Sequence, residues 1–330
     1  MQTSIGKDNR LLWTLAGVAG IAFLVLLFFA WYWSRQPAIF WVETGVEPEQ
    51  STIGFATTNT LIKVSSTLLD KPGGFLVNDI APPSVFLDNI PSFEVGVLTQ
   101  VRDLARVMRN DYSRSQSQST EDEDLSAAES QFFIDYNKWW FPAAEDEYRK
   151  GITSLERYQS RLLDTNNNQA KFFARADNLR EWLGQVEKRL GNMSQRLTAS
   201  VGQARINTDL AGDASAVSGG GNSEQDIVVK TSWWEIDDVF FEARGTAWAL
   251  VHFLRAAEFD FAQVLKDKNA TVSLRQIIRE LESSLASVNS PMILNGSGYG
   301  LFANHSLVLA SYLSRANAAV IDLRELLDQG

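Results

Sequence analysis

The feature that most constrains this chain is an apolar segment near its N-terminus. Residues 11–33 read LLWTLAGVAGIAFLVLLFFAWYW, which is 23 residues without a charged side chain. As an α-helix this segment is about 35 Å long, enough to cross a bilayer with its tryptophans at both interfaces. A cleaved signal peptide has a shorter apolar run followed by small residues, whereas Trp31 to Arg35 here are mostly bulky. We therefore expect residues 11–33 to form an uncleaved transmembrane helix.

The orientation of this helix rests on few charges. Lys7 and Arg10 precede it, partly offset by Asp8, and Arg35 after it is followed by acidic residues. The positive-inside rule then places residues 1–10 in the cytoplasm as a short tail. We expect a single-pass protein of a bacterial inner membrane, with its C-terminal domain in the periplasm of a Gram-negative cell. The absence of cysteine is compatible with that location.

The composition excludes several classes of function. The chain has 30 Lys and Arg against 40 Asp and Glu, a net charge of −10, which opposes binding to nucleic acid. It has no cysteine, which excludes thiolate chemistry, zinc fingers and iron–sulfur clusters. It has only two histidines, too few for a metal site made mainly of imidazole ligands. We expect no cofactor and no bound metal.

Helical periodicity dominates the rest of the chain and predicts an all-α fold. The clearest stripe is a heptad seam of apolar residues spaced alternately by four and three, namely Phe172, Ala176, Leu179, Leu183, Val186, Leu190, Met193 and Leu197. A shorter stripe over residues 148–162 precedes it across a turn-like Asn-rich segment, so we expect the two helices to form a long antiparallel hairpin. A dimeric coiled coil is the alternative explanation of the seam.

Two segments divide the predicted helical bundle. Residues 34–50 form a juxtamembrane segment, and residues 206–229 form a flexible linker or insertion, because residues 206–226 have no aromatic or basic side chain and several Gly and Ser. The helical domain then has a first part over residues 51–205 and a second part over residues 230–330. Thr120 with Glu123 has the pattern of a capping box, which predicts a helix start there.

The aromatic residues include two adjacent pairs, Trp139-Trp140 and Trp233-Trp234. Such pairs fit a ligand groove or a second contact with a membrane. Because large aromatic side chains contribute most to protein cores, our default prediction is that these four tryptophans are packed inside the bundle.

Several segments of the chain together resemble a known family. They are Lys71 to Gly74 (KPGG), Tyr112 to Ser119 (YSRSQSQS), Trp234 to Gly245 (WEIDDVFFEARG), Ser290 to Gly296 (SPMILNG) and Ala303 to Leu307 (ANHSL). With the N-terminal span they resemble an uncharacterised family of membrane-anchored bacterial proteins described as a domain of unknown function. The resemblance covers nearly the whole chain. It implies an inner-membrane protein of Gram-negative bacteria and brings no site residues with it.

One candidate binding site is a stripe of arginines. Arg102, Arg106 and Arg109 are spaced by four and three residues, so they share one face of a helix. Three guanidinium groups can grip phosphate or carboxylate groups, such as a lipid headgroup or an acidic partner. The alternative is that they pair with carboxylates of the chain itself, for instance the acidic run Glu121 to Asp124.

The candidate catalytic residues are Asp238, Glu242 and His305. Asp238 and Glu242 lie one helical turn apart and can share one hard cation, whereas His252 lies about 15 Å further along the same helix. A polar network within the bundle is the alternative for these acids, with Arg244 or Arg255 as partners. His305 is followed by Ser306, but adjacent helical residues point about 100° apart and rarely form a catalytic pair.

These observations lead to three hypotheses about function. The first is a non-enzymatic envelope protein whose periplasmic helical domain scaffolds or binds other envelope components, among them a protein partner. The second is a membrane-tethered enzyme that uses Asp238, Glu242 or His305. The third is a binder of anionic lipid headgroups through the arginine stripe. The sequence predicts neither the partner nor the oligomeric state.

Overall fold

The structure is a computed structural model that describes residues 5–43, 52–115, 120–164, 170–205, 227–290, 292–297 and 300–329. Its α-helices are α1 (Ile5–Trp33), α2 (Phe55–Asp70), α3 (Asn89–Val107), α4 (Glu123–Phe132), α5 (Ala144–Leu163), α6 (Ala176–Thr198), α7 (Ile236–Asp260), α8 (Ala262–Asp267), α9 (Thr271–Ser284) and α10 (His305–Asp328). Shorter elements are η2 (Ser84–Phe86), the π-helical turn η3 (Met108–Tyr112), η4 (Ala199–Val201), η5 (Trp233–Glu235) and two strands, β1 (Gln203–Arg205) and β2 (Ile227–Val229).

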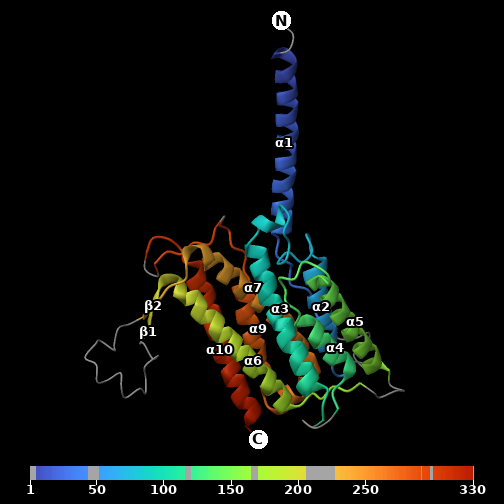
Figure 1. The fold of residues 1–330 in the computed structure, drawn as a ribbon. Helices are drawn as coiled ribbons and strands as arrows, with labels where there is room; N and C mark the ends of the chain where they lie inside the picture. The colour runs from blue at the N-terminus through green and yellow to red at the C-terminus, as the bar shows by residue number, and fades with distance from the viewer. Residues whose placement is uncertain are drawn as a thin grey trace, which may run out of the picture.

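Helix α1 stands apart from the other helices, which form a bundle below its C-terminal end (Figure 1). Residues Leu12–Trp33 are long and apolar enough to cross a membrane, and none of this stretch is buried inside the molecule. An unburied apolar helix of this length is typical of a membrane anchor or a signal sequence. The all-α fold with one N-terminal candidate span is therefore confirmed.

Most neighbouring helices in the bundle are antiparallel. Arg161 near the end of α5 bonds Asp122 just before α4, with 2.7 Å between Nη2 and Oδ1. Ser194 near the end of α6 lies 2.6 Å from Ser314 in the middle of α10, between their hydroxyl oxygens, and Arg180 at the start of α6 pairs with Asp328 at the end of α10. These pairs fix α4 against α5 and α6 against α10.

The predicted hairpin of residues 148–162 with residues 172–197 is not the pairing that forms. Helix α5 packs on α4 and α2, and α6 packs mainly on α10. The seam itself is buried as expected, with Leu179, Leu183, Leu190 and Leu197 fully enclosed. The periodicity identified the buried face of α6 correctly. The predicted partner helix was wrong because an apolar stripe does not specify which helix will cover it. The apolar stripe of α10 is longer than that of α5, and it is the one that packs on α6.

Helices α3 and α7 form the centre of the bundle and run parallel. Ser92 near the start of α3 donates to Asp238 near the start of α7, at 2.8 Å between Oγ and Oδ1. The two backbones approach closely where Gly96 faces Gly245, because a Cβ built on Gly96 would lie 2.1 Å from the Glu242 carbonyl oxygen. One hydrophobic core includes residues from both sides of the 206–226 segment.

Two helix starts differ from the sequence prediction. The N-cap of α4 is Asp122, whose carboxylate accepts the backbone N–H groups of Asp124 and Leu125 at 3.0 and 3.2 Å, so the capping box at Thr120 is not the one used. At the end of α7 the helix breaks at Phe261, and α8 follows separately. The spacing of the apolar residues between Phe240 and Leu265 predicts one uninterrupted helix here.

Residues 206–226 of the predicted linker lie outside the described residues. Its last three residues, Ile227–Val229, pair with Gln203–Arg205 in an antiparallel two-stranded ribbon. Residues 34–43 of the predicted juxtamembrane segment are extended and lie against the bundle, and we call them the strap.

Candidate functional site

The predicted acidic pair on α7 does not form one binding site. Asp238 accepts the Ser92 hydroxyl, and Glu242 pairs with Arg196 of α6 at 2.8 Å between its carboxylate and Nη2. Partial burial, followed by the nearby Asp88 and Asp237 carboxylates, raises the pKa of Asp238. Among the described residues no group of three or more His, Asp or Glu side chains is arranged to hold a metal ion.

The candidate base His305 is held by its own loop. Its Nδ1 accepts the backbone N–H of Leu294 at 3.1 Å, and its backbone N–H donates to the Leu294 carbonyl at 2.9 Å. The preceding residue, Asn304, caps α10 by accepting the N–H of Leu307 at 2.8 Å. The contacts of His305 therefore anchor the loop to the start of α10, and Asp238 and Glu242 have other partners.

The arginine stripe on α3 and η3 is occupied by groups of the chain itself. Arg102 donates to the carbonyls of Phe132 and Ile134 at 2.7 and 2.8 Å, where α4 ends. Arg106 and Arg109 both pair with Glu129 of α4, at 3.2 and 2.8 Å between Nε and its carboxylate oxygens. These contacts match the alternative of pairing within the chain, although Glu129 and backbone carbonyls are the main partners.

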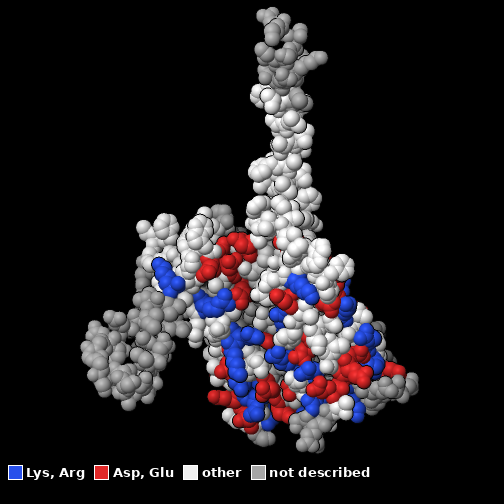
Figure 2. Space-filling view, in the orientation of Figure 1, with Lys and Arg blue, Asp and Glu red and all other residues white. Residues whose placement is uncertain are grey.

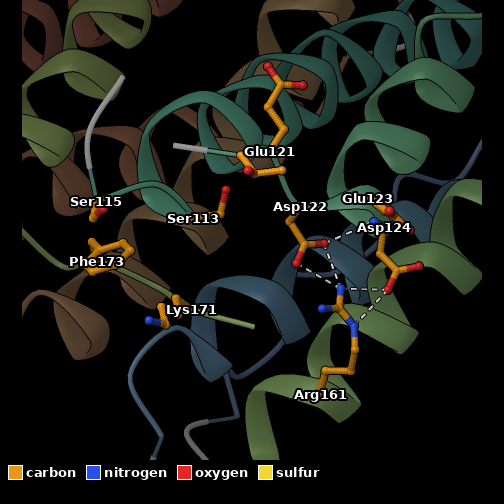
Figure 3. A pocket seen from close by; sticks show the side chains of 10 residues that line it. Ser113, Ser115, Glu121, Asp122, Glu123, Asp124, Arg161, Lys171 and Phe173 are labelled. Carbon is orange, nitrogen blue, oxygen red and sulfur yellow. Dashed lines mark hydrogen bonds and ion pairs between the residues drawn. The ribbon is translucent and has the colours of Figure 1, made fainter. Parts of the chain in front are cut away.

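The acidic run Glu121 to Asp124 lines a cavity of about 670 Å³ at the end of the bundle away from α1. Asp122 and Asp124 both point toward Arg161, whereas Lys171 lies apart from these ion pairs (Figure 3). Arg161 Nη2 lies 2.7 Å from a carboxylate oxygen of each aspartate. Asp122 and Asp124 are thus bonded to Arg161, which holds the start of α4 to the end of α5.

A site that the sequence analysis did not identify lies at the opposite end, where the strap runs along α7. Polar groups of the strap bond α7 side chains four residues apart, in the pairs Gln36 with Arg244, Ala38 with Trp248 and Phe40 with His252. Two residues of extended chain advance about 6.8 Å and four residues of α-helix advance 6.0 Å, so the two repeats match. The strap therefore follows one stripe of α7 for three consecutive contacts.

The deepest of these contacts is made by His252, which is fully buried. Its Nδ1 lies 2.7 Å from the Trp248 carbonyl and its Nε2 lies 3.1 Å from the Phe40 backbone nitrogen. The Phe40 N–H requires an acceptor, so these partners assign the proton to Nδ1 and leave Nε2 as a lone pair. Burial lowers the pKa of His252 to about 4, which keeps the ring neutral.

Arg244 joins the strap to the end of α9. It is almost fully buried and donates to the carbonyls of residues 284–286 at 3.0–3.2 Å, and through Nε to Gln36 at 3.1 Å. A guanidinium at a helix C-terminus satisfies carbonyls that have no helical partner and matches the negative end of the helix dipole. Burial lowers the pKa of Arg244. The prediction that Arg244 pairs with Asp238 or Glu242 is wrong, since it bonds carbonyls.

The KPGG turn packs against the last residue of α1 and is tied to α3. Gly73 has a positive φ of 88° and lies against Trp33, since a Cβ there would be 2.8 Å from the Trp33 ring. Lys71 forms a salt bridge with Glu94, and both side chains are buried, at 2% and 0% exposure. Glu94 also accepts the backbone N–H groups of residues 76 and 77 at 2.9 and 3.1 Å. Burial raises the pKa of Glu94 against the opposing effect of Lys71.

Four of the five segments that carry the family resemblance meet at this end of the bundle: Lys71 to Gly74, Trp234 to Gly245, Ser290 to Gly296 and Ala303 to Leu307. A family model described as an uncharacterized protein conserved in bacteria, DUF2333, matches residues 6–330. The chain belongs to the DUF2333 family. No curated protein and no solved structure shows significant similarity to it. The family match covers the candidate span, the strap and the bundle together.

One feature of this chain's sequence indicates the strap site. Arg244, Trp248 and His252 are polar or amphipathic residues at intervals of four within the stretch of α7 that has the fewest other charged residues, which indicates a stripe with its own partner. The partner was not identifiable, because an extended segment has no helical periodicity. The buried Lys71–Glu94 pair left no signal, since its members are far apart in sequence and each resembles an ordinary surface charge.

Proposed function

We propose that this chain is a non-enzymatic, single-pass inner-membrane protein whose periplasmic helical bundle binds or scaffolds other components of the cell envelope. The observation that carries the proposal is the strap. It leaves α1 directly after Trp33 and is bonded to α7 at Gln36, Ala38 and Phe40. A bundle attached in this way has a fixed direction relative to its anchor, which suits a protein that presents surfaces to partners.

The attachment leaves little freedom between anchor and bundle. Trp33, the last residue of α1, packs against the hydrophobic core and beside Gly73. The strap is then fixed by hydrogen bonds to buried side chains, including His252 and Arg244. A catalytic domain on a flexible tether needs no such contacts, whereas a scaffold depends on them.

The separation of the candidate catalytic groups also supports a binding role. Asp238, Glu242 and His305 each bond a different group, namely Ser92, Arg196 and the Leu294 backbone. A general base needs to face a substrate position together with a nucleophile or a metal. The polar side chains at the two ends of the bundle, such as Arg161 and Arg244, instead hold the helices to one another.

The location of the bundle is tested with a single cysteine, since the chain has none of its own. Val272 in α9 is 77% exposed at the end of the bundle away from α1, so Val272→Cys should react with an impermeant thiol reagent without disturbing packing. Labelling in cells with an intact inner membrane is the expected result. Labelling only after that membrane is permeabilised would overturn the periplasmic assignment.

The binding role is tested by gentle detergent extraction of the tagged full chain, with the isolated anchor segment as control. A protein that co-purifies in stoichiometric amount with the full chain and not with the anchor is the expected result. Recovery of lipid or a small molecule alone would contradict the scaffold role. Alanine at Asp238, Glu242 and His305 completes the test, because a folded variant that loses an associated activity would favour an enzyme.

A further inference from the structure

The predicted core packing of the paired tryptophans is wrong. Trp139 and Trp140 are 50% and 68% exposed, and Trp233 and Trp234 are 69% and 78% exposed. They lie in connections between helices, where the backbone turns at the surface and no neighbouring helix covers a side chain. Of the five exposed tryptophans that the described residues hold outside α1, these are four, and Trp41 of the strap is the fifth.

Other large apolar side chains are exposed in the same connections. The four segments concerned are residues 71–88, 133–143, 230–235 and 285–304, and we call their exposed apolar side chains the apolar rim. Its members are Ile80, Val85, Phe86, Trp139, Trp140, Phe141, Trp233, Trp234, Met292, Leu301 and Phe302, each at least half exposed. Single exposed apolar residues are normal, but a concentration of this size marks a contact surface.

All four segments lie at the end of the bundle from which α1 emerges. Segment 71–88 follows α2 and contains Gly73, which touches Trp33. Helices α3 and α7 start beside it, because Glu94 bonds Lys71 and Ser92 bonds Asp238.

Contacts between antiparallel helices place the remaining connections at the end of the bundle from which α1 emerges. Arg149 at the start of α5 bonds Asp70 at the end of α2, which places segment 133–143 here. Arg244 at the start of α7 bonds carbonyls after α9, which places segment 285–304 here. Figure 2 shows many uncharged side chains around the base of α1, next to one cluster of acidic side chains, whereas charged side chains of both signs crowd the lower part of the bundle.

We infer that the apolar rim rests in the interface of the same bilayer that α1 spans. The inference rests on the proposed role of α1 as an uncleaved anchor. A spanning helix that ends at Trp33 places the headgroup region at the level of Trp33, and this residue packs on the bundle itself. The face around it therefore meets the headgroups without an intervening linker.

The chemistry and distribution of the rim fit a bilayer better than a protein partner. Tryptophan is the residue most typical of membrane interfaces, and the rim holds four tryptophans with three phenylalanines. The side chains come from four separate connections at the end of the bundle where α1 ends, so they do not share a single groove, although Trp233, Trp234 and Met292 border a cavity of about 500 Å³. Side chains spread over that end match a plane perpendicular to a transmembrane helix, whereas a peptide or helix partner needs one continuous groove.

The charges between the rim side chains define the kind of lipid. Asp88, Glu235, Asp237 and Asp238 lie at the starts of α3 and α7 and outnumber the basic residues of this end, Arg35, Lys138 and Lys230, and burial and mutual repulsion raise the pKa of Asp237 and Asp238. Carboxylates at this level repel anionic headgroups. The contact therefore depends on insertion of apolar side chains among zwitterionic lipids, and an anionic surface should weaken it.

The test measures how deeply chosen positions lie in a bilayer. Single variants Phe86→Cys, Trp140→Cys, Trp234→Cys and Leu301→Cys of the full chain are spin-labelled and placed in phosphatidylethanolamine nanodiscs. Collision with oxygen, which concentrates in lipid, is compared with collision with a water-soluble nickel complex. Val272→Cys serves as the water-exposed control, and Val25→Cys in the middle of the span as the lipid control.

The oxygen-to-nickel ratio at the four rim positions is expected to lie several-fold above that at Val272→Cys and below that at Val25→Cys. Adding phosphatidylglycerol should lower the ratio at the rim and leave Val25→Cys unchanged. Rim labels as accessible to nickel as Val272→Cys, with Val25→Cys still in lipid, would overturn the inference and leave the anchor intact. An aqueous Val25→Cys would instead overturn the anchor, and rim labels protected only when a protein partner is present would assign the rim to that partner.

Discussion

The ring of His252 stacks on the ring of Phe40, with 3.9 Å between ring centroids, while its Nε2 accepts the Phe40 backbone N–H at 3.1 Å. One side chain of α7 thus holds both the backbone and the side chain of the strap. The hydrogen bond needs a neutral imidazole, because a protonated Nε2 has no lone pair to accept with. The attachment of the strap, and through it of α1, to the bundle is therefore coupled to protonation.

Acidification should loosen the strap. The pKa of His252 is lowered from 6.5 to about 4 by burial, with Arg255 and Lys63 as nearby cations that lower it further. The unfolded chain binds a proton below pH 6.5 and the folded chain does not, so stability is full above pH 6.5 and falls as the pH drops toward 4. The loss over this window should be about 3 kcal/mol. Chemical denaturation of the full chain in micelles at several pH values measures it.

The matched control for this prediction is His252→Gln, which keeps an acceptor for the Phe40 N–H and does not titrate. Its unfolding free energy should be lower than that of the unmodified chain at neutral pH but should decline less between pH 6.5 and pH 4. Equal declines in both proteins would assign the pH dependence to other groups.

The buried pair of Lys71 and Glu94 should be sensitive to removal of one member. Lys71→Met leaves the Glu94 carboxylate buried without its cation, which should cost about 3–5 kcal/mol of unfolding free energy. The double variant Lys71→Met with Glu94→Gln removes both charges and should recover part of the loss. Thermal or denaturant unfolding followed by circular dichroism gives the values.

An exposed pair provides the control for this comparison. Asp70 and Arg149 pair at 3.0 Å, with side chains 59% and 57% exposed, so Arg149→Met should cost less than about 1 kcal/mol. A loss in Lys71→Met no larger than in Arg149→Met would show that the buried pair is not a stabilising contact of the KPGG turn.

The crossing of α3 and α7 should not tolerate a methyl group. A Cβ on Gly245 would lie 2.0 Å from the Phe93 carbonyl oxygen, and one on Gly96 would meet Glu242 at a similar distance. Gly245→Ala and Gly96→Ala force the two backbones apart and should each lower the unfolding free energy by about 2–3 kcal/mol. Gly191→Ala in α6 is the control, since its nearest neighbour is 3.6 Å away. That variant should be neutral or more stable by up to about 1 kcal/mol, because alanine favours helix.

Substitution of the arginine stripe should affect stability more than lipid binding. Arg106→Glu with Arg109→Glu places two carboxylates beside Glu129 and should cost about 2 kcal/mol. Glu129→Gln, which leaves both arginines in place, should also lower stability. The amount of phosphatidylglycerol that co-purifies with each variant should equal that of the unmodified chain. Selective loss of this lipid from the double arginine variant, with stability unchanged, would restore the stripe as a headgroup site.

Local patterns in the sequence predicted the helices and their buried faces. The seam residues Leu179 to Leu197 are buried because apolar residues recurring every three or four positions form a face that folding removes from water. The span over residues 11–33 was identified for a related reason, since an uninterrupted apolar run of that length fits a bilayer. The arginines of α3 were correctly expected to share one face, which follows from the helical repeat.

These local patterns did not predict which helix face packs against which other face. The α6 seam packs on α10 and not on α5, and Glu129 and two carbonyls, not the acidic run alone, are the partners of the arginine stripe. The paired tryptophans were expected inside the bundle because large aromatic side chains are usually buried. They are exposed because they lie in connections at one end of the bundle.

The sequence by itself determined the helical class, the apolar span and the composition of each buried face, because these depend on interactions within a few turns of one helix. Only the tertiary structure decided that the strap lies on His252, that Lys71 meets Glu94 and that four connections with exposed apolar residues lie at the end of the bundle where α1 ends. Those contacts join residues as many as 212 positions apart. They depend on how whole helices pack, and no local pattern of side chains encodes that.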